Sequence, residues 1–297
     1  MTGELAFIQS LRDLATHPAA RGLNDDAAVL EIGAETLVLT QDSMVEGVHY
    51  LPGQDMADVA WKLVAANLSD LAAKGAVPLG VLYTHMLGEN DDQFVAGMRE
   101  VLAAYDTPLL GGDTVGRGQA IPPPARSFSL TAIGRAAHTP VPSRSGAQPG
   151  DGVFITGPVG AAMMGFEALE RGLAEAGMAF RRPLPLLSQG HALAPLVSAM
   201  MDVSDGLLLD ASRMASASQV TIAIAAHDVP IAAPEERRGD ALRWGDDYQL
   251  LFTGPKTVLW PSEAHYIGTV LPAGDTALLL DGAPLPADDP LGYRHSG

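Results

Sequence analysis

Short apolar runs of strand length alternate with longer helical patterns along most of this chain. Four runs in the first half are bounded by turn-forming residues and are predicted strands: 27–32, 36–40, 79–86 and 127–133. Between them, the helical spacing of apolar residues predicts helices over 56–74 and 91–105. Alternation of this kind predicts an α/β chain in which helices cover the faces of a sheet.

A connection rich in proline and glycine separates this half from a second unit. The stretch 136–151 holds three Pro and two Gly in a polar context, which is typical of a link between packed domains. Beyond it we predict strands at 152–156, 220–225, 248–253 and 266–270, and helices at 161–174, 188–200 and 206–216. We therefore expect an N-terminal domain over 1–138, a linker over 139–150 and a C-terminal domain over 151–297.

The remaining segments are predicted from their composition. An amphipathic helix is expected over 1–17, an exposed loop over 116–126 and an irregular surface tail over 272–297. The start of the chain lacks the basic and apolar regions of a secretory signal, and no segment reaches the ~20 apolar residues of a membrane-spanning helix. We expect a soluble cytoplasmic protein.

The charge balance disfavours several classes of partner and reaction. Eighteen Lys plus Arg against 35 Asp plus Glu give a formal net charge of −17, whereas nucleic acids and anionic membranes are bound through clustered positive charge. We therefore expect no nucleic-acid partner and no membrane partner. The chain has no cysteine, which excludes a disulfide, a thiolate zinc site and a cysteine nucleophile.

The common phosphate-binding motifs are also missing. None of the three lysines, Lys62, Lys74 and Lys256, follows a glycine, so there is no G-x-x-x-x-G-K-[ST] loop. No G-x-G-x-x-G follows a predicted strand, and the kinase H-R-D motif is absent. If the chain handles a nucleotide, it must do so through carboxylates and metal ions.

Aspartates at the junctions between predicted strands and small residues are the most informative feature. They fall in five places: Asp25 with Asp26, Asp42, Asp113, Asp202 with Asp205, and Asp246 with Asp247. Ligands of α/β proteins bind at strand ends, and carboxylates that converge there repel one another unless cations neutralise them. Oxygen donors without thiolates favour Mg²⁺, which usually accompanies phosphate. A single Asp is better explained as a turn or cap residue, but five coincidences favour a magnesium and phosphate site.

Two other polar features have a simple and a functional interpretation. Asn67, Asp70 and Lys74 share one face of the predicted helix 56–74. The spacing alone favours the solvated side of that helix over a ligand-binding face. His49 follows Asp42 in a predicted loop. A lone His is usually structural or exposed, but beside an acidic cluster it could donate a hydrogen bond to phosphate.

Seven motifs taken together resemble those of the thiamine-monophosphate kinases, which belong to the superfamily of aminoimidazole-ribonucleotide synthetase. They are NDDAAV at 24–29, TQDSMVEGVH at 40–49, NLSDLAAKGA at 67–76, GGDT at 111–114, RSGAQPGD at 144–151, DVSDGL at 202–207 and GDDYQL at 245–250. They run through nearly the whole chain in the order of the family. Each motif alone is weak, whereas the ordered set is specific.

The resemblance implies an α/β (α+β) protein of two domains, the first with a mixed sheet and helices, and a homodimer in which the N-terminal sheets associate. It also implies ATP and several Mg²⁺ ions, with direct transfer of the γ-phosphoryl group to thiamine monophosphate to give thiamine diphosphate and ADP. Such a transfer requires positioning and charge neutralisation. It needs no phosphoenzyme and no obligatory general base, because the attacking phosphate oxygen is already negative.

The resemblance also assigns residues to roles. The implied magnesium ligands are Asp26, Thr40, Gln41, Asp42, Asp70, Asp113, Asp202 and Asp205. The implied ATP contacts are Gly112, Asp113, Arg144 and Ser204. His49, Asp246 and Tyr293 would face thiamine monophosphate. No residue is expected to act covalently, and His49 and Arg144 would orient the substrates and neutralise their charge.

The chain departs from the family pattern at several positions. Gln41 stands where threonine is common, and Asn24 stands where glycine is usual. Trp244-Gly245-Asp246 replaces Gly-Gly-Glu, which shortens the substrate-facing carboxylate by one methylene. The loop at 116–126 is longer than is typical, and the aromatic match near the C-terminus is poor.

Two alternative functions are another ATP-dependent enzyme of the superfamily and a non-catalytic nucleotide-binding module. Selenophosphate synthetases usually use a cysteine or selenocysteine, and the hydrogenase-maturation dehydratase uses a cysteine, so the absence of cysteine counts against both. Aminoimidazole-ribonucleotide synthetase is compatible with the fold, but the motifs at 40–49 and 67–76 fit the thiamine enzymes better. Intact aspartates in every magnesium motif disfavour a module without catalysis.

Overall fold

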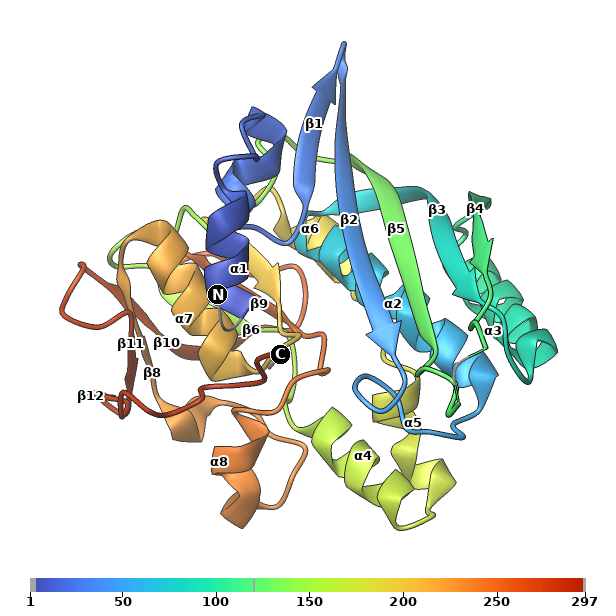
Figure 1. Ribbon diagram of the computed structural model, residues 1–297. Coiled ribbons are helices and arrows are strands. Elements are labelled where there is room, and N and C mark those ends of the chain that lie inside the picture. Colours follow the sequence, from blue (N-terminus) through green and yellow to red (C-terminus); the bar gives the residue numbers. More distant parts are fainter. Residues whose placement is uncertain (1–3, 120, 296–297) are drawn as a thin grey trace.

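The first half of the chain forms a mixed five-stranded sheet in the computed structural model, which describes residues 4–119 and 121–295 (Figure 1). Its strands are β1 (Ala28–Ile32), β2 (Glu35–Val45), β3 (Ala76–Met86), β4 (Leu109–Val115) and β5 (Ser127–Ala136), in the order β1-β2-β5-β3-β4. Only β3 and β4 pair in parallel; the other neighbours are antiparallel. Helices α2 (Met56–Ala73) and α3 (Asp91–Ala104) cover one face.

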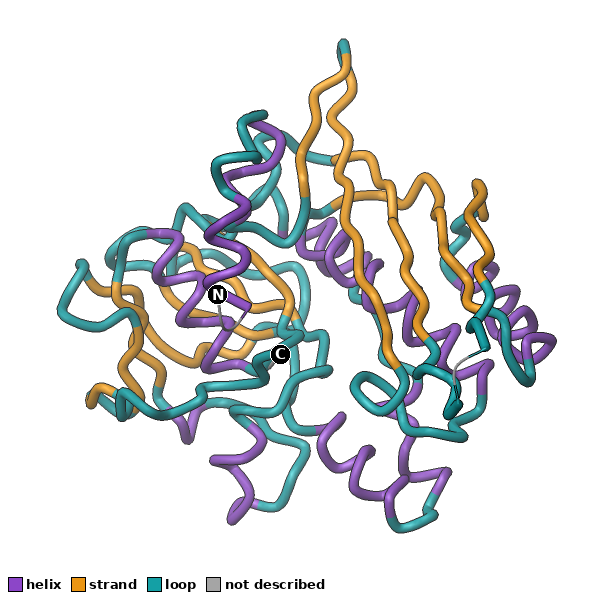
Figure 2. The backbone as a smooth tube through the Cα atoms, in the orientation of Figure 1, coloured by secondary structure: helices purple, strands orange, loops and turns teal. Residues whose placement is uncertain are grey.

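The second half forms a seven-stranded sheet. Its strands are β6 (Gly152–Ile155), β7 (Ala199–Asp202), β8 (Thr221–Ile224), β9 (Leu250–Gly254), β10 (His265–Leu271), β11 (Leu278–Leu280) and β12 (Ala283–Pro284), in the order β12-β11-β8-β10-β6-β9-β7. The helices are α4 (Ala161–Glu170), α5 (Met178–Arg181), α6 (Leu187–Leu193), α7 (Leu207–Ser218) and α8 (Arg238–Ala241). Two mixed sheets with covering helices confirm the predicted fold class (Figure 2).

Strand periodicity explains why this second sheet is buried on both faces. Val153 and Ile155 of β6 pack in the same core cluster as α7, whereas Phe154 points to the other face and packs with residues of α2 and α6. Successive side chains of a strand point to opposite faces, so a strand covered on both sides is apolar throughout. All four residues of β6 are accordingly buried.

Helix α2 lies between the two sheets and belongs to the cores of both halves. Leu63, Leu68 and Leu71 pack in the core of the first half, while Ala72 and Ala73 pack against the second sheet. Fifteen of its residues are buried, among them Asn67, and Lys74 at its C-cap is also buried. The expectation that the polar face of this helix is solvated is therefore wrong, because the second half of the chain covers that face.

Several predicted boundaries need correction. The predicted helix 188–200 ends at Leu193, and Ala199–Asp202 is instead strand β7, which pairs with β9. Pro195 explains the break, since proline cannot continue a helix. Strand β2 continues to Val45, so Asp42 lies within it rather than after its end.

The terminal segments also differ from the predictions. Helix α1 covers only Glu4–Leu11 of the helix expected over 1–17, whose first three residues lie outside the described part. The tail contributes the short strands β11 and β12, so it is irregular only in part. The described residues of the loop 116–126 contain no helix or strand.

Four short 3₁₀ helices complete the described elements: Pro18–Leu23, Ala174–Gly177, Ala226–Asp228 and Glu235–Arg237. The first and last described residues lie close together (Figure 1): the backbone N–H of His295 donates to the Glu4 carboxylate at 3.3 Å. None of the helices within the described ranges combines the length and the hydropathy that a membrane crossing needs.

We predict that Gly97→Ala destabilises the protein, although alanine normally favours a helix by about 1 kcal/mol over glycine. A methyl group at Gly97 of α3 would lie 2.2 Å from the carbonyl oxygen of Ala57 in α2, so the two helices must separate. We expect a net loss of about 1–3 kcal/mol, as for other overpacked sites. Urea unfolding followed by circular dichroism measures it. Gly116→Ala is the control, because nothing lies within 4 Å of that methyl position; equal stability of the two variants would contradict the close packing of α2 and α3.

Candidate active site

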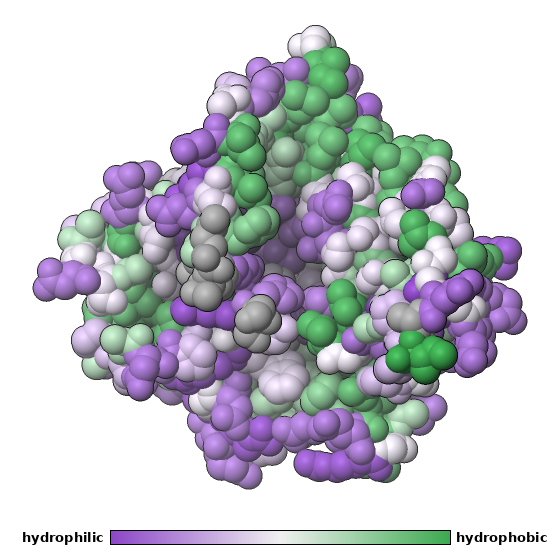
Figure 3. Space-filling model, in the orientation of Figure 1, coloured by the Kyte–Doolittle hydropathy of each residue, from purple (hydrophilic) through white to green (hydrophobic). Residues whose placement is uncertain are grey.

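Carboxylates from both halves of the molecule converge on one cleft beside α2. Asp26 precedes β1, Asp42 lies on β2 and Asp70 on α2, whereas Asp202 ends β7 and Asp205 lies in the turn before α7. All five line a cleft of about 1830 Å³, visible as the hollow between the two halves in Figure 3. Carboxylate oxygens of Asp26, Asp70 and Asp202 lie within 4.8 Å of one another. The structure thus brings together most of the predicted magnesium ligands.

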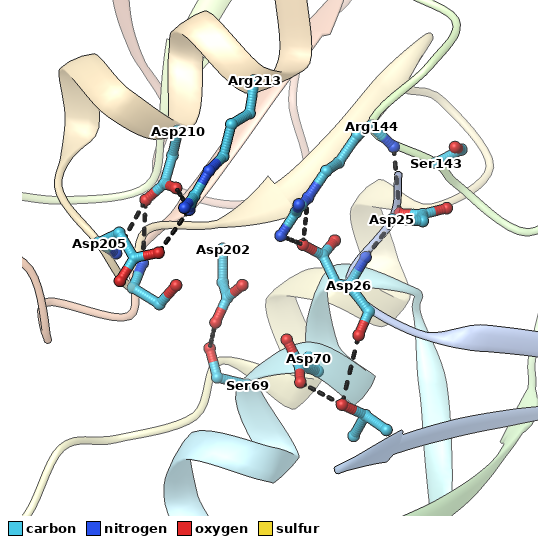
Figure 4. Close-up of polar contacts among 12 residues, drawn as sticks. Asp25, Asp26, Ser69, Asp70, Ser143, Arg144, Asp202, Asp205, Asp210 and Arg213 are labelled. Atoms are coloured by element: carbon cyan, nitrogen blue, oxygen red, sulfur yellow. Dashed lines mark hydrogen bonds and ion pairs between the residues drawn. The ribbon is translucent and has the colours of Figure 1, made fainter. Parts of the chain in front are cut away.

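Polar side chains of α2 hold these carboxylates in place. Asn67 accepts a hydrogen bond from the backbone N–H of Asp42 at 3.0 Å, which ties α2 to β2. The Ser69 hydroxyl donates to Asp202 at 2.6 Å, which ties α2 to β7 (Figure 4). Thr40 donates to Asp70, and its side chain is buried. Helix α2 therefore sets the spacing of carboxylates that come from two different sheets.

Asp42, Asp70 and Asp202 form a part of the cluster without cationic partners. No ion pair among the described residues involves any of these three carboxylates. Burial, with the charge of Asp205, raises the pKa of Asp42 to about 6. Burial, with the charge of Asp26, raises the pKa of Asp202 to about 8. The pKa of Asp70 is raised well above its usual value by burial and by both neighbours. These groups favour either protons or added cations.

Asp25 and Asp26, in contrast, are paired with cationic side chains. Arg21 lies 2.5 Å from Asp25, and Lys74 lies 2.6 Å from both carboxylates. Arg144 lies 2.5 Å from Asp26 (Figure 4). Burial would raise the pKa of Asp25, but Lys74 and Arg21 lower it to about 2. Two of these cations, Arg21 and Lys74, escaped the sequence-based site assignment. Lys74 is 49 residues from Asp25, so the pair leaves no local pattern, whereas Arg21 is only four residues from Asp25 but outside any predicted element.

A further aspartate that sequence reasoning missed is Asp210 in the first turn of α7. Its carboxylate accepts the backbone N–H groups of Ser204 and Asp205 at 3.2 and 3.1 Å, and it pairs with Arg213 at 2.9 Å (Figure 4). Arg213 also contacts Asp205 at 2.5 Å. Asp210 therefore shapes the turn that presents Ser204 and Asp205 to the cleft. The sequence signal that could have identified Asp210 is its position four residues after Gly206, in the first turn of a predicted helix.

His49 and Asp246 also line the cleft, and they are joined by a lysine that sequence reasoning did not select. Lys62 is fully buried, and its ammonium lies 2.7 Å from the Asp246 carboxylate and 3.0 Å from the His49 carbonyl. Tyr248 donates to the second Asp246 oxygen at 3.0 Å. Lys62 and Tyr248 thus fix the Asp246 side chain, which is one methylene shorter than the glutamate of the family pattern. The exposed fraction of this side chain is 28%.

The orientation of the His49 ring follows from one hydrogen bond. Its Nδ1 accepts the backbone N–H of Val45 at 3.0 Å, so the proton of the neutral ring lies on Nε2. Burial and the nearby His295 lower the pKa of His49. The His295 ring lies 5.5 Å from that of His49 and 5.0 Å from that of Tyr293. The tail therefore brings Tyr293 into the cleft beside these rings, where its backbone N–H also donates to the carbonyl oxygen of Asp205 at 2.8 Å.

Three predicted site residues are placed differently. Gly112 and Asp113 lie on β4, at the opposite edge of the first sheet from β1, and do not line the cleft of their own chain. The side chain of Gln41 accepts a hydrogen bond from Thr131 of β5 at 3.1 Å, since it alternates with Thr40 and Asp42 along β2. Its amide therefore does not join the carboxylate cluster. Ser204 and Arg144 do line the cleft.

We predict that the metal-free protein loses stability as the pH rises from about 5 to 8. The raised pKa values of Asp42 and Asp202, about 6 and 8, mean that the folded state holds more protons than the unfolded state across this range, so the free energy of unfolding falls with pH. The lowered pKa of Asp25 affects the free energy of unfolding only below about pH 4, so it does not contribute to the change expected between pH 5 and 8.

Thermal unfolding with a chelator should therefore show a melting temperature lower by about 2–3 °C at the alkaline end, the shift expected for a loss of about 1–2 kcal/mol in a chain of 297 residues. Excess Mg²⁺ should reduce the difference, since a bound cation replaces the protons of Asp42 and Asp202. The part due to Asp210 and Asp247, whose pKa values burial raises to about 7, should remain. A melting temperature that rises with pH in the chelator would contradict this description of the cluster.

Comparisons with known proteins agree with the geometry. Residues 24–136 match the N-terminal domain of the AIR synthase related proteins, and residues 148–279 match their C-terminal domain. The chain is 36% identical over 255 residues to the thiamine-monophosphate kinase of Salmonella typhimurium, covering 79% of this chain and 76% of that protein. It is 36% identical over 258 residues to that of Escherichia coli K12, with the same coverage of 79% and 76%.

A solved structure named "AaThiL complexed with AMPPCP and TMP" superimposes with a TM-score of 0.87 at 27% identity, covering 99% of this chain and 97% of that one. The resemblance inferred from the seven motifs is thereby confirmed. The chain belongs to the AIR synthase related proteins and, among them, to the thiamine-monophosphate kinase family.

Proposed function

We propose that this chain transfers the γ-phosphoryl group of ATP to thiamine monophosphate in a magnesium-dependent reaction, giving thiamine diphosphate and ADP. Its relatives are named for this kinase activity, and a similar structure holds AMPPCP and TMP. The single observation that carries the proposal is the group Asp42, Asp70 and Asp202, which converges in the cleft and makes no ion pair with any described residue. A site for polyphosphate and divalent cations accounts for that arrangement.

The donor set fits magnesium, because it consists of oxygen ligands only. In this proposal Asp26, Asp42, Asp70, Asp202 and Asp205 hold the ions, and the Thr40 hydroxyl supports Asp70. Bound Mg²⁺ would neutralise the phosphates of both substrates and hold them in line for transfer. The protein supplies fixed positions for these ligands, through α2, and a cleft that accepts both substrates.

Arg144 and Ser204 are proposed to contact ATP. The Arg144 side chain is 19% exposed and lies in the cleft, where it pairs with Asp26. A guanidinium presents several donors in a planar fork that suits phosphate oxygens. The backbone of Ser204 is fixed by Asp210, so its side chain enters the cleft from a rigid turn.

His49, Asp246 and Tyr293 are proposed to contact thiamine monophosphate. A lowered pKa keeps His49 neutral, and its Nε2–H is free to donate to the acceptor because Nδ1 is engaged by Val45. His49 therefore orients the acceptor through a hydrogen bond rather than a charge. No general base is required, since the attacking phosphate oxygen already carries negative charge.

We propose that residues 1–138 form the domain that binds ATP and magnesium and dimerises, with 139–150 as the linker and 151–297 as the second domain. None of the described helices covers the face of the first sheet opposite α2 and α3 (Figure 1). The neighbouring strands β3 and β4 expose a set of apolar residues: Val77, Leu79, Leu82, Leu109 and Leu110. An apolar patch of this kind favours association. In a homodimer, Gly112 and Asp113 on β4 would lie near the second chain rather than in the cleft of their own.

Replacing Asp42 with Asn is expected to lower turnover by at least about 100-fold, as for the loss of a metal ligand at a phosphoryl-transfer site. The metal-free fold should be retained or stabilised, because one charge leaves a crowded cluster. Asp205→Asn should behave in the same way. Product is measured as thiamine diphosphate by chromatography after incubation with ATP, Mg²⁺ and thiamine monophosphate.

Asp92→Asn is the control for these variants, since Asp92 is an exposed residue of α3 outside the cleft. Near-normal turnover by Asp42→Asn would overturn the metal assignment. Absence of product from the unsubstituted protein at every Mg²⁺ concentration would overturn the kinase proposal, and ATP binding without product would instead favour a nucleotide-binding module.

Leu82→Arg is expected to give a monomer, because it places a charge in the exposed apolar patch of β3. Light scattering after size exclusion should give the 30.9 kDa of one chain for this variant and twice that mass for the unsubstituted protein. Leu259→Arg is the matched control, since Leu259 is 94% exposed in the second half of the chain. A monomeric unsubstituted protein would refute the proposed dimer.

A further inference from the structure

Trp244 lines the cleft, although none of the roles proposed above uses it. It precedes Asp246 by two residues and stands where the family pattern has glycine. Its side chain is half-buried. The centroid of its ring lies 5.4 Å from that of Phe166, another residue of the cleft, at 43° between the ring planes. Two neighbouring aromatic side chains therefore border the cleft.

The other two tryptophans have packing roles that Trp244 lacks. Trp61 packs against the core of the first half, and its indole N–H donates to the carbonyl oxygen of Pro183 at 2.9 Å. Trp260 packs against a core cluster of the second sheet. Trp244 and Phe166 are not part of the core clusters that the described residues form. Aromatic side chains that border a cleft outside the cores are typical of ligand contacts.

The turn that carries Trp244 is fixed by the turn before α7. The backbone N–H of Asp246 donates to the carbonyl oxygen of Ser204 at 2.8 Å. A methyl group at Gly245 would lie 2.2 Å from the same oxygen, so this close approach requires glycine. The indole is therefore presented from a rigid turn, which lowers the entropy cost of binding a ligand against it.

Phe166 is fixed relative to the same turn by Asp247. The Asp247 carboxylate accepts the backbone N–H groups of Gly160 and Ala162 at 2.6 and 3.1 Å. These two residues lie at the start of α4, the helix that carries Phe166. The protein itself therefore sets the distance between the rings of Phe166 and Trp244.

A series of contacts joins this aromatic pair to Asp246 and His49. The Phe180 ring lies 5.3 Å from that of Phe166, and the Lys62 ammonium lies 3.6 Å from the centroid of the Phe180 ring. The same ammonium lies 2.7 Å from the Asp246 carboxylate and 3.0 Å from the His49 carbonyl oxygen. The aromatic pair thus adjoins residues that are proposed to contact thiamine monophosphate.

The faces of these two rings attract a cation that the neighbouring carboxylate attracts only weakly. Lys62 and Tyr248 each engage one oxygen of Asp246, so the charge of Asp246 is already balanced. No cation–π contact within the described part of the chain involves Trp244 or Phe166. Tryptophan is the strongest aromatic partner of a cation. A cationic ring in this part of the cleft is therefore attracted mainly by the indole.

We propose that Trp244, with Phe166, forms the surface against which the rings of thiamine monophosphate stack, so that Trp244 determines the preference for an acceptor with a cationic aromatic ring. The thiazolium ring of thiamine carries a fixed positive charge, and its aminopyrimidine ring is aromatic. Stacking and cation–π attraction act on both. The proposal rests on the proposed function and names a residue that selects the acceptor.

The first test is the tryptophan fluorescence of the full-length protein, titrated with thiamine monophosphate and Mg²⁺ without ATP. Of the three tryptophans, Trp244 alone lines the cleft. We expect quenching in the unsubstituted protein and in the control Trp260→Phe, and loss of that quenching in Trp244→Phe. Glycerol 3-phosphate, a phosphate monoester without rings, should not quench.

Steady-state kinetics of two variants separate stacking from apolar contact. Leucine is apolar but has no ring face, so Trp244→Leu should raise the KM for thiamine monophosphate about 10-fold. Phenylalanine keeps a ring, so Trp244→Phe should raise it by no more than about 3-fold. The kcat and the KM for ATP should stay the same in both variants, as for the loss of uniform binding of one substrate.

An unchanged KM for thiamine monophosphate in Trp244→Leu, or full quenching in Trp244→Phe, would overturn the proposal. A rise in the KM for ATP instead would also overturn it, because adenine would then be the ring that stacks on Trp244. Failure of the proposed function has a different result: the unsubstituted protein would form no thiamine diphosphate, whereas an error in the role of Trp244 leaves that reaction intact.

Discussion

Mutual repulsion among buried carboxylates at the junction of two sheets is the constraint on which this structure depends. Asp26, Asp70 and Asp202 come from different elements, and their oxygens lie within 4.8 Å of one another. Such a group is stable only if protons or cations compensate its charge. The protein supplies lysine and arginine on one side, at Asp25 and Asp26. For Asp42, Asp70 and Asp202 the described residues supply no ion pair, so protons or cations that enter the cleft must compensate their charge.

Helix α2 makes this arrangement possible because it belongs to both cores at once. Its leucines fill the first half, and its alanines allow close approach of the second sheet. Its polar residues bond to the backbone N–H of Asp42 in one sheet and to the carboxylate of Asp202 in the other. A helix with one solvated face could not hold Asp202 and Asp42 at fixed positions simultaneously. The same burial explains why Lys62 and Lys74 are each fixed by ion pairs rather than exposed.

The reaction proposed for the cleft uses these parts in a simple way. Phosphoryl transfer between two phosphate-bearing substrates requires positioning and charge neutralisation more than covalent chemistry. The carboxylate cluster meets the second requirement through cations, and Arg144, Ser204, His49 and Asp246 line the same cleft, in which the substrates are proposed to bind. The short, internally paired Asp246 shows how a departure from the family pattern can be accommodated: Lys62 and Tyr248 fix its position.

The sequence by itself determined the alternation of strands and helices, the family and most of the carboxylate site, because periodicity and ordered motifs are local properties of a chain. It could not determine that the polar face of α2 is buried, that Asp113 lies away from the cleft of its own chain, or that Lys74, Arg21 and Asp210 take part in the cluster. Most of those facts depend on which distant segments pack together, and an ion pair such as that of Lys74 with Asp25, 49 residues apart, leaves no periodic signal. The pairs of Arg21 and Asp210 are local, but only the packing shows that they lie beside the cleft. Only the tertiary structure decided which carboxylates the protein neutralises itself and which it leaves for added cations.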